Sequence, residues 1–199
     1  MTMAVIFTVA PARAEGFELT PVLGYRIGGE VDDEISGEKL ELDEAATFGL
    51  IFGFPLDYQS VVEVEIEHQE TSLQGGAVSS GQDLFDLGVT SIQAGGRYQS
   101  DHDKVKGFVA GGLGVSLFRP KGDLDGVQLD DEWAWVLSLG GGAIIPVSEK
   151  LAVRLEGRAL GTFLLDSTGA FCAQGVCAVS IEGSGFLQAE FRVGLAISF

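Results

Sequence analysis

The sequence offers few side chains suited to catalysis. It contains two histidines, His68 and His102, and a hydrolytic triad needs a histidine beside a serine nucleophile, oriented by a third group. His68 falls near the end of an alternating stretch, and His102 lies between Asp101 and Asp103 in a short turn. That turn has two open interpretations, a metal site or a solvated corner, and the second is the commoner one. We expect no catalytic residue, no metal site and no cofactor.

The two cysteines lie close together in the longest connecting segment. Cys172 and Cys177 are separated by four residues, and in an oxidising compartment such a pair forms a local disulfide. Its stabilisation is modest because the closed loop is short. A metal-binding thiolate pair is the alternative, although no other Cys or His stands nearby to complete a tetrahedral set. We therefore predict a Cys172–Cys177 disulfide that shapes a loop.

The remaining chemistry-bearing residues are charges that alternate with apolar residues. Residues 62–67 read Val-Glu-Val-Glu-Ile-Glu, and glutamates in such a row do not face a dry apolar core without partners. Arginines occupy equivalent alternate positions elsewhere, so we predict ion pairs inside a narrow enclosure; hydration near its rims is the alternative. Glu18 is also expected to point inward. The predicted lumen charge network comprises ten residues: Arg26, Glu63, Glu65, Glu67, Arg97, Arg154, Glu156, Arg158, Glu190 and Arg192.

β-Strands must position these residues. Alternation with a period of two is typical of strands, and the 29 glycines favour sheet over helix. No window approaches the roughly 20 apolar residues of a membrane-spanning helix, which excludes a helical membrane protein. The predicted strands lie at about residues 17–29, 45–54, 60–69, 89–98, 108–118, 133–145, 151–163 and 186–199.

The connections between these strands alternate in length. Short connections fall at residues 55–59, 99–106 and 146–150, and the others are long. Transmembrane barrels have short turns on one rim and long loops on the other, and an even strand number places both ends on the short-turn rim. The fold class that we predict is all-β, an eight-stranded antiparallel up-and-down transmembrane β-barrel spanning residues 15–199.

The types of residue on each face decide between a membrane barrel and a soluble one. A lipocalin-like barrel turns its charged face to water, whereas the polar face here is rich in Gly, Ser and Thr and carries both signs of charge, as in a narrow interior. The apolar face carries aromatic residues near strand ends, which is typical of aromatic girdles at two membrane interfaces. These aromatics are Tyr25, Phe54, Tyr98, Trp133, Trp135, Phe163 and Phe199.

The N-terminus and the overall charge bear on cellular location and partners. Residues 1–14, MTMAVIFTVAPARA, resemble the apolar region and cleavage site of a secretory signal, without the usual preceding basic residue. We expect a true start upstream; a tail of a cytosolic protein is the alternative. The net charge of −17 excludes electrostatic binding to nucleic acid. The acidic first and third loops either bind Ca²⁺ or Mg²⁺ bridging lipopolysaccharide, or are simply solvated.

Two motifs carry a family resemblance. Residues 191–199, FRVGLAISF, resemble the C-terminal assembly signal of outer-membrane barrels, with alternate residues Phe191, Val193, Leu195, Ile197 and Phe199. Residues 107–118, GFVAGGLGVSLF, resemble the corresponding strand of the OmpA-like and opacity-protein family of small outer-membrane β-barrels. The resemblance covers residues 15–199 and implies bacterial outer-membrane location and recognition by the barrel-assembly machinery. The family's best-known member continues into a periplasmic peptidoglycan-binding domain, whereas no residue here supports cell-wall tethering.

The resemblance also implies a structural or surface-interaction role, in envelope integrity or adhesion. From the residues themselves we expect no enzyme activity. The expected partners are outer-membrane lipid, lipopolysaccharide and an unidentified surface partner of the long loops. A narrow ion channel or a small-ligand-binding barrel is the alternative. A lipid-modifying outer-membrane enzyme is less favoured, because the sequence provides no histidine placed beside a serine nucleophile.

Overall fold

Eight long antiparallel strands close into a barrel in the computed structural model. The structure describes residues 16–32, 39–74, 83–100, 104–121, 123–124, 127–128, 131–164, 170–173, 176–179 and 185–199. Each long strand pairs with its neighbours along the chain, and the first pairs with the last from Glu18↔Ser198 to Gly28↔Gln188. The predicted fold class is confirmed. The barrel strands are β1 (Glu18–Gly28), β4 (Ala45–Pro55), β5 (Ser60–Gln74), β6 (Asp83–Gln99), β7 (Lys106–Lys121), β10 (Glu132–Pro146), β11 (Leu151–Leu164) and β14 (Gly185–Ser198).

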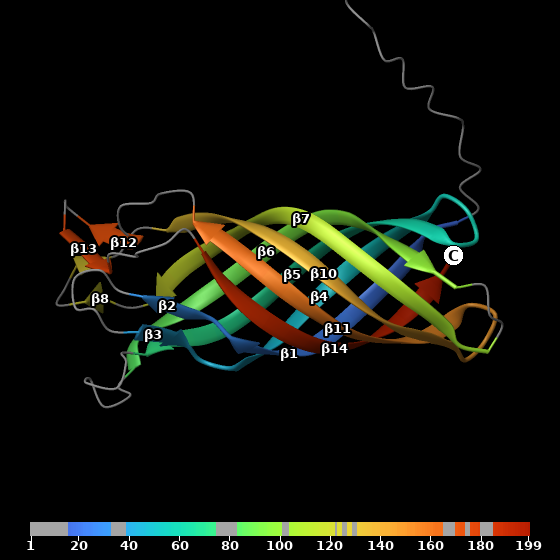
Figure 1. Cartoon of the computed structure of the whole chain (residues 1–199), viewed down its shortest axis with the longest axis horizontal. Helices are drawn as coiled ribbons and strands as arrows, with labels where there is room; N and C mark the ends of the chain where they lie inside the picture. Colours follow the sequence, from blue (N-terminus) through green and yellow to red (C-terminus); the bar gives the residue numbers. More distant parts are fainter. Residues whose placement is uncertain are drawn as a thin grey trace, which may run out of the picture.

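Short hairpins gather at one end of the barrel (Figure 1). They are β2 (Glu30–Asp32) with β3 (Lys39–Leu42), β8 (Asp123–Leu124) with β9 (Val127–Gln128), and β12 (Ala170–Ala173) with β13 (Val176–Val179). The sequence did not predict them. Among the described residues there is no helix with the length and apolar character needed to cross a membrane.

Three barrel strands are longer than predicted, all at this same end. β5 continues to Gln74 instead of residue 69, β6 begins at Asp83 instead of residue 89, and β7 continues to Lys121 instead of residue 118. The backbone ladder continues there although the apolar alternation has stopped. The prediction failed because it relied on side-chain alternation, whereas backbone hydrogen bonds hold strands together with either kind of side chain.

The opposite end carries the short turns and both described ends of the barrel chain (Figure 1). The amide of Phe199 donates to the carbonyl oxygen of Phe17 at 3.0 Å, and their rings stack with centroids 4.5 Å apart. In the first turn, Asp57 Oδ1 accepts the amides of Gln59 and Ser60, each at 2.7 Å. Because these bonds favour the carboxylate, they lower the pKa of Asp57 below its usual range.

The outer wall is apolar. Leu139, Leu187 and Leu23 are 71%, 69% and 66% exposed, although such residues fill the core of a soluble domain. All seven predicted girdle aromatics are exposed on the same wall. A contiguous apolar exterior around a polar interior is the arrangement of a barrel whose outside meets lipid.

Some inward positions accept only glycine because neighbouring strands approach closely. A Cβ built on Gly142 of β10 would lie 1.9 Å from the carbonyl oxygen of Leu155 and 2.9 Å from the Cα of Glu156 on β11. Backbone atoms cannot move aside as a flexible side chain can. The glycine content that predicted sheet therefore also permits the curvature of the closed wall.

Replacing Gly142 tests this close approach. We expect Gly142→Ala to lower the free energy of unfolding by about 1–3 kcal/mol, as overpacking does, measured by urea titration of the barrel in lipid vesicles. The control is Gly161→Ala on β11, whose Cβ would meet ring atoms of Phe163 at 3.4 and 3.5 Å, an ordinary contact. Equal losses for the two variants would contradict the steric explanation.

Candidate functional site in the barrel lumen

The ten residues predicted to form the lumen charge network, from Arg26 to Arg192, all point into the barrel. Their exposed fractions run from 0% for Arg154 and Glu190 to 8% for Glu63. The network draws on β1, β5, β6, β11 and β14, because the period of two turns every second side chain of a strand toward the axis. Charges so deeply buried require partners, and each of these ten makes at least one ion pair.

Arg158 lies at the centre of the network. From β11 its Nη1 donates to Glu65 Oε1 at 2.7 Å, its Nε donates to Glu190 Oε2 at 2.5 Å, and its Nη2 donates to Glu67. β5, which carries Glu65 and Glu67, is separated from β11 by three strands around the wall. These contacts therefore cross the lumen.

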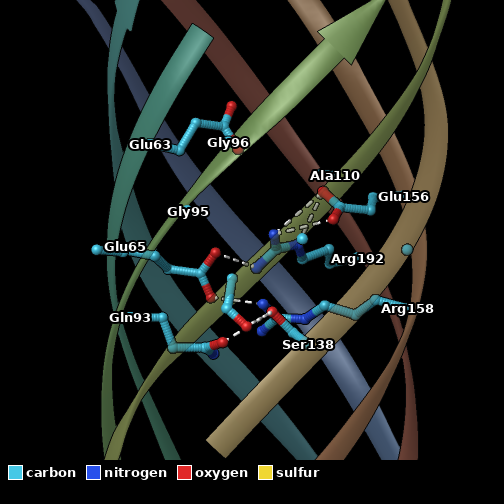
Figure 2. Close-up of a pocket in the computed structure, with 14 residues that line it drawn as sticks. Glu63, Glu65, Gln93, Gly95, Gly96, Ala110, Ser138, Glu156, Arg158 and Arg192 are labelled. Atoms are coloured by element: carbon cyan, nitrogen blue, oxygen red, sulfur yellow. Dashed lines mark hydrogen bonds and ion pairs between the residues drawn. The ribbon is translucent and has the colours of Figure 1, made fainter. Parts of the chain in front are cut away.

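Two further arginines surround this centre. Arg192 donates through Nε and Nη2 to the two oxygens of Glu156, both at 3.1 Å, and its Nη1 lies 2.8 Å from Glu65 Oε2 (Figure 2). Arg26 donates to Glu67 Oε1 at 2.7 Å and to the amide oxygen of Gln69 at 3.1 Å. Glu65 is thus shared between two guanidinium groups, and Glu67 among three, since Arg192 Nη1 also lies 3.6 Å from Glu67 Oε2.

The network continues toward the short-turn end. Arg154 donates through Nη1 and Nη2 to the two carboxylate oxygens of Glu63, at 2.6 and 3.1 Å, and through Nε to Glu156 at 2.8 Å. Arg97 binds both oxygens of Glu18, at 3.0 and 3.2 Å. The guanidinium of Arg154 also lies 4.8 Å from the ring centroid of the buried Phe108, a cation–π contact. The prediction did not single out Phe108, although its alternate position in β7 was available as a signal.

Apolar residues also point inward, which the interpretation of this face as polar missed. On β6, β7, β10 and β11, six of them lie between the charge network and the long-loop end, and we call these six the luminal apolar layer; others, including Phe108 and Ile144, lie toward the short-turn end. An apolar side chain is stable there because the interior at this level holds side chains instead of water. The layer consists of Leu87, Val89, Phe118, Ala134, Val136 and Leu160, exposed by 1%, 5%, 4%, 0%, 1% and 1%.

A small cavity lies beside the charge network. It has a volume of about 30 Å³ and is lined by charged side chains of β5, β11 and β14 and by glycines of β6, β7 and β10 (Figure 2). Ser138 donates to the amide oxygen of Gln93 at 2.7 Å, and the amide nitrogen of Gln93 has no protein partner. The space suits one or two water molecules, far less than a solute path.

The other predicted residues fall at separate places. Cys172 and Cys177 are direct register partners in the β12–β13 hairpin, and their side chains lie outside the described part of the structure. The C-terminal signal runs along β14, with Phe191, Val193, Leu195 and Phe199 exposed on the outer wall and Ile197 partly so. Residues 1–14, His102 and much of the acidic first and third loops also lie outside the described residues.

No catalytic arrangement forms around the described histidine. His68 Nδ1 lies 2.9 Å from Thr90 Oγ1, and its Nε2 lies 3.8 Å from Glu70, on the outer wall. Among the residues that the structure describes, no cluster of three His, Cys, Asp or Glu residues has the geometry of a metal site.

Comparisons with known proteins bear on the fold. No family model matches the chain, and no curated protein matches it. Neisserial surface protein A is 13% identical with a TM-score of 0.58, covering 92% of this chain and 97% of its own. The outer membrane protein OprG of Pseudomonas aeruginosa is 13% identical with a TM-score of 0.57, covering 92% and 96%. Ail of Yersinia pestis, solved with a heparin analogue, is 13% identical with a TM-score of 0.52, covering 92% and 99%. At this identity the likeness shows the fold of small outer-membrane barrels.

Removal of the central guanidinium tests how much the network stabilises the barrel. Arg158→Ala leaves buried carboxylates short of a partner, so we expect the free energy of unfolding to fall by about 3–5 kcal/mol. The control is Lys121→Ala, which breaks an ion pair with Glu70 between side chains 48% and 67% exposed and should cost less than about 1 kcal/mol. Urea titration in lipid vesicles measures both, and a similar small loss in both would refute a stabilising role for the network.

Proposed function

We propose that this protein is an outer-membrane β-barrel with a closed lumen and a structural or surface-interaction role. The observation that carries the proposal is the charge network, in which Arg158 of β11 binds Glu65 and Glu67 on the opposite wall of the barrel. An eight-stranded barrel encloses a space that side chains can fill. The ion pairs occupy that space, and a permeating ion would have to displace them.

The proposed location rests on the outer wall. Its exposed leucines and its aromatics at strand ends match what lipid and membrane interfaces favour. The solved barrels of similar fold include a protein described as an outer membrane protein. We assign the chain to the OmpA-like kind of barrel, with outer-membrane lipid around it and assembly through the outward residues of β14.

The long-loop end is proposed as the part that meets partners. Of the 29 acidic residues, 18 lie in the four long connecting segments, residues 29–44, 70–88, 119–132 and 165–184, together with only 3 of the 12 basic residues. This end therefore repels polyanions, in contrast to Ail, which was solved with a heparin analogue. Cationic partners, or lipopolysaccharide bridged by divalent cations, suit it instead.

Conductance and surface exposure test the proposed function together. We expect the purified barrel to give no current steps in planar bilayers beyond those of protein-free membranes, because the network blocks the lumen. In whole Gram-negative cells, externally added protease should cut within residues 165–184 and leave the outer-membrane barrel intact. An open porin reconstituted at equal density is the positive control. Current steps from the wild-type barrel would overturn the closed-lumen role, and protection of the loops would overturn the orientation.

We also propose that Cys172 and Cys177 form a disulfide. Their backbones are paired across β12 and β13, and a cross-strand pair has a Cα separation within reach of an S–S bond. Intact-mass measurement after thiol alkylation without reductant should show no modification of wild-type protein exported to an oxidising compartment. Alkylation of both thiols would exclude the bond; the Cys172→Ser variant, with one free thiol, calibrates the labelling.

A further inference from the structure

On four of the eight barrel strands, the luminal apolar layer lies between the charge network and the long-loop end. On β11, Leu160 occupies the inward position directly after Arg158, so the change from charged to apolar takes one step along the strand. On β10, Val136 faces inward and is paired with Thr162 of β11 and Gly114 of β7. Beyond it, the ring of Phe118 meets that of Phe186 edge-on, with centroids 6.2 Å apart.

We propose that this layer is a second barrier to ions, in series with the charge network, so that the lumen stays closed even when the network is loosened. The inference rests on the proposed closed-lumen function and goes beyond it. It assigns the closure to two structures of opposite chemistry. Neither barrier has to block every ion by itself, because an ion must pass both the charge network and the luminal apolar layer.

Burial supports a dry layer. Val136 and Leu160 are each 1% exposed, which a water-filled passage beside them would not permit. Narrow apolar constrictions expel water and thereby stop ions, which cannot shed their hydration without replacement ligands. The layer supplies no such ligands.

Polar side chains at the same level are already engaged. Thr71 donates to the carbonyl oxygen of Asp43 at 2.6 Å, and the amide of Gln188 donates to the carbonyl oxygen of Gly28 at 3.1 Å. Both residues are at least nine-tenths buried. These two side chains are therefore already hydrogen-bonded and are not free to replace an ion's water shell.

The two barriers can be weakened separately. Arg158→Gln with Glu190→Gln removes the central pair at constant net charge, while Glu67 keeps Arg26 and Glu65 keeps Arg192 as partners. Val136→Thr with Leu160→Asn keeps side-chain volume nearly constant and makes the layer wettable. The apolar control for the second pair is Val136→Ile with Leu160→Met.

Potassium efflux from loaded lipid vesicles containing each folded barrel is the readout. We expect the wild type and each polar pair alone to match protein-free vesicles, and the four-fold variant to raise efflux at least about tenfold once water can enter both levels. The network pair combined with the apolar control should stay closed. Folding of every variant is verified by circular dichroism and by its migration on unheated gels.

Each outcome has a defined meaning. Potassium leakage through the Arg158→Gln, Glu190→Gln variant shows that the luminal apolar layer alone does not block ions. Leakage through the Val136→Thr, Leu160→Asn variant shows that the charge network alone does not block them. Either result overturns the series arrangement. A folded four-fold variant that stays closed overturns it as well, as does leakage with the apolar control. Leakage of the wild type instead overturns the closed-lumen function itself.

A labelling measurement covers the case in which the four-fold variant does not fold. Both variants carry Cys172→Ser and Cys177→Ser, and each adds one new cysteine: Val136→Cys in the layer, or Lys121→Cys at an exposed side chain. The thiol of Val136→Cys should react with an external membrane-impermeant reagent at least about a hundredfold more slowly than that of Lys121→Cys, because a dry layer excludes the reagent. Equal rates would show that water reaches the layer and would overturn the proposal.

Discussion

The need to pair charge inside a closed, nearly dry space is the constraint on which this barrel depends. Arg158 satisfies it by holding three glutamates, two of them on the opposite wall. An unpaired ion there would cost several kcal/mol. A slip of one residue in β1, β5, β6, β11 or β14 would send the network charges of that strand into lipid and its apolar residues inward. The network therefore favours the register of these five strands as well as filling the lumen.

The same period of two serves opposite environments on the two faces of each strand. Outward positions carry leucines and aromatic residues that only lipid or another apolar surface can cover, while inward positions carry ion pairs, glycines and the luminal apolar layer. Close approach of strands, as at Gly142, lets the wall curve tightly around a filled interior. The small diameter of the barrel and the filling of its lumen by side chains therefore depend on each other, because the charges of a wider barrel would need water to solvate them.

A closed barrel leaves its ends as the places where function can reside. The long-loop end holds most of the acidic residues and the short hairpins, and the filled lumen provides a rigid base for them. The surface-interaction role that we propose is consistent with this division, because an acidic end repels polyanions. In the same proposal, the charge network and the luminal apolar layer are two consecutive barriers beneath the loops.

The sequence alone determined the strand number, the alternation of short and long connections, the common rim of both barrel ends and the inward placement of the charged residues, since all of these follow from a local period of two. Only the closed structure decided which charges meet. Arg158 and Glu65 are 93 residues apart in sequence and 2.7 Å apart in space, because strand tilt and ring closure set the contacts across the axis. The luminal apolar layer escaped prediction for the same reason: the interpretation of the inner face as polar did not single out Val136 and Leu160, which closure buries inside the lumen. Alternation assigns a side chain to a face; it does not say whether that face holds water, ions or packed side chains.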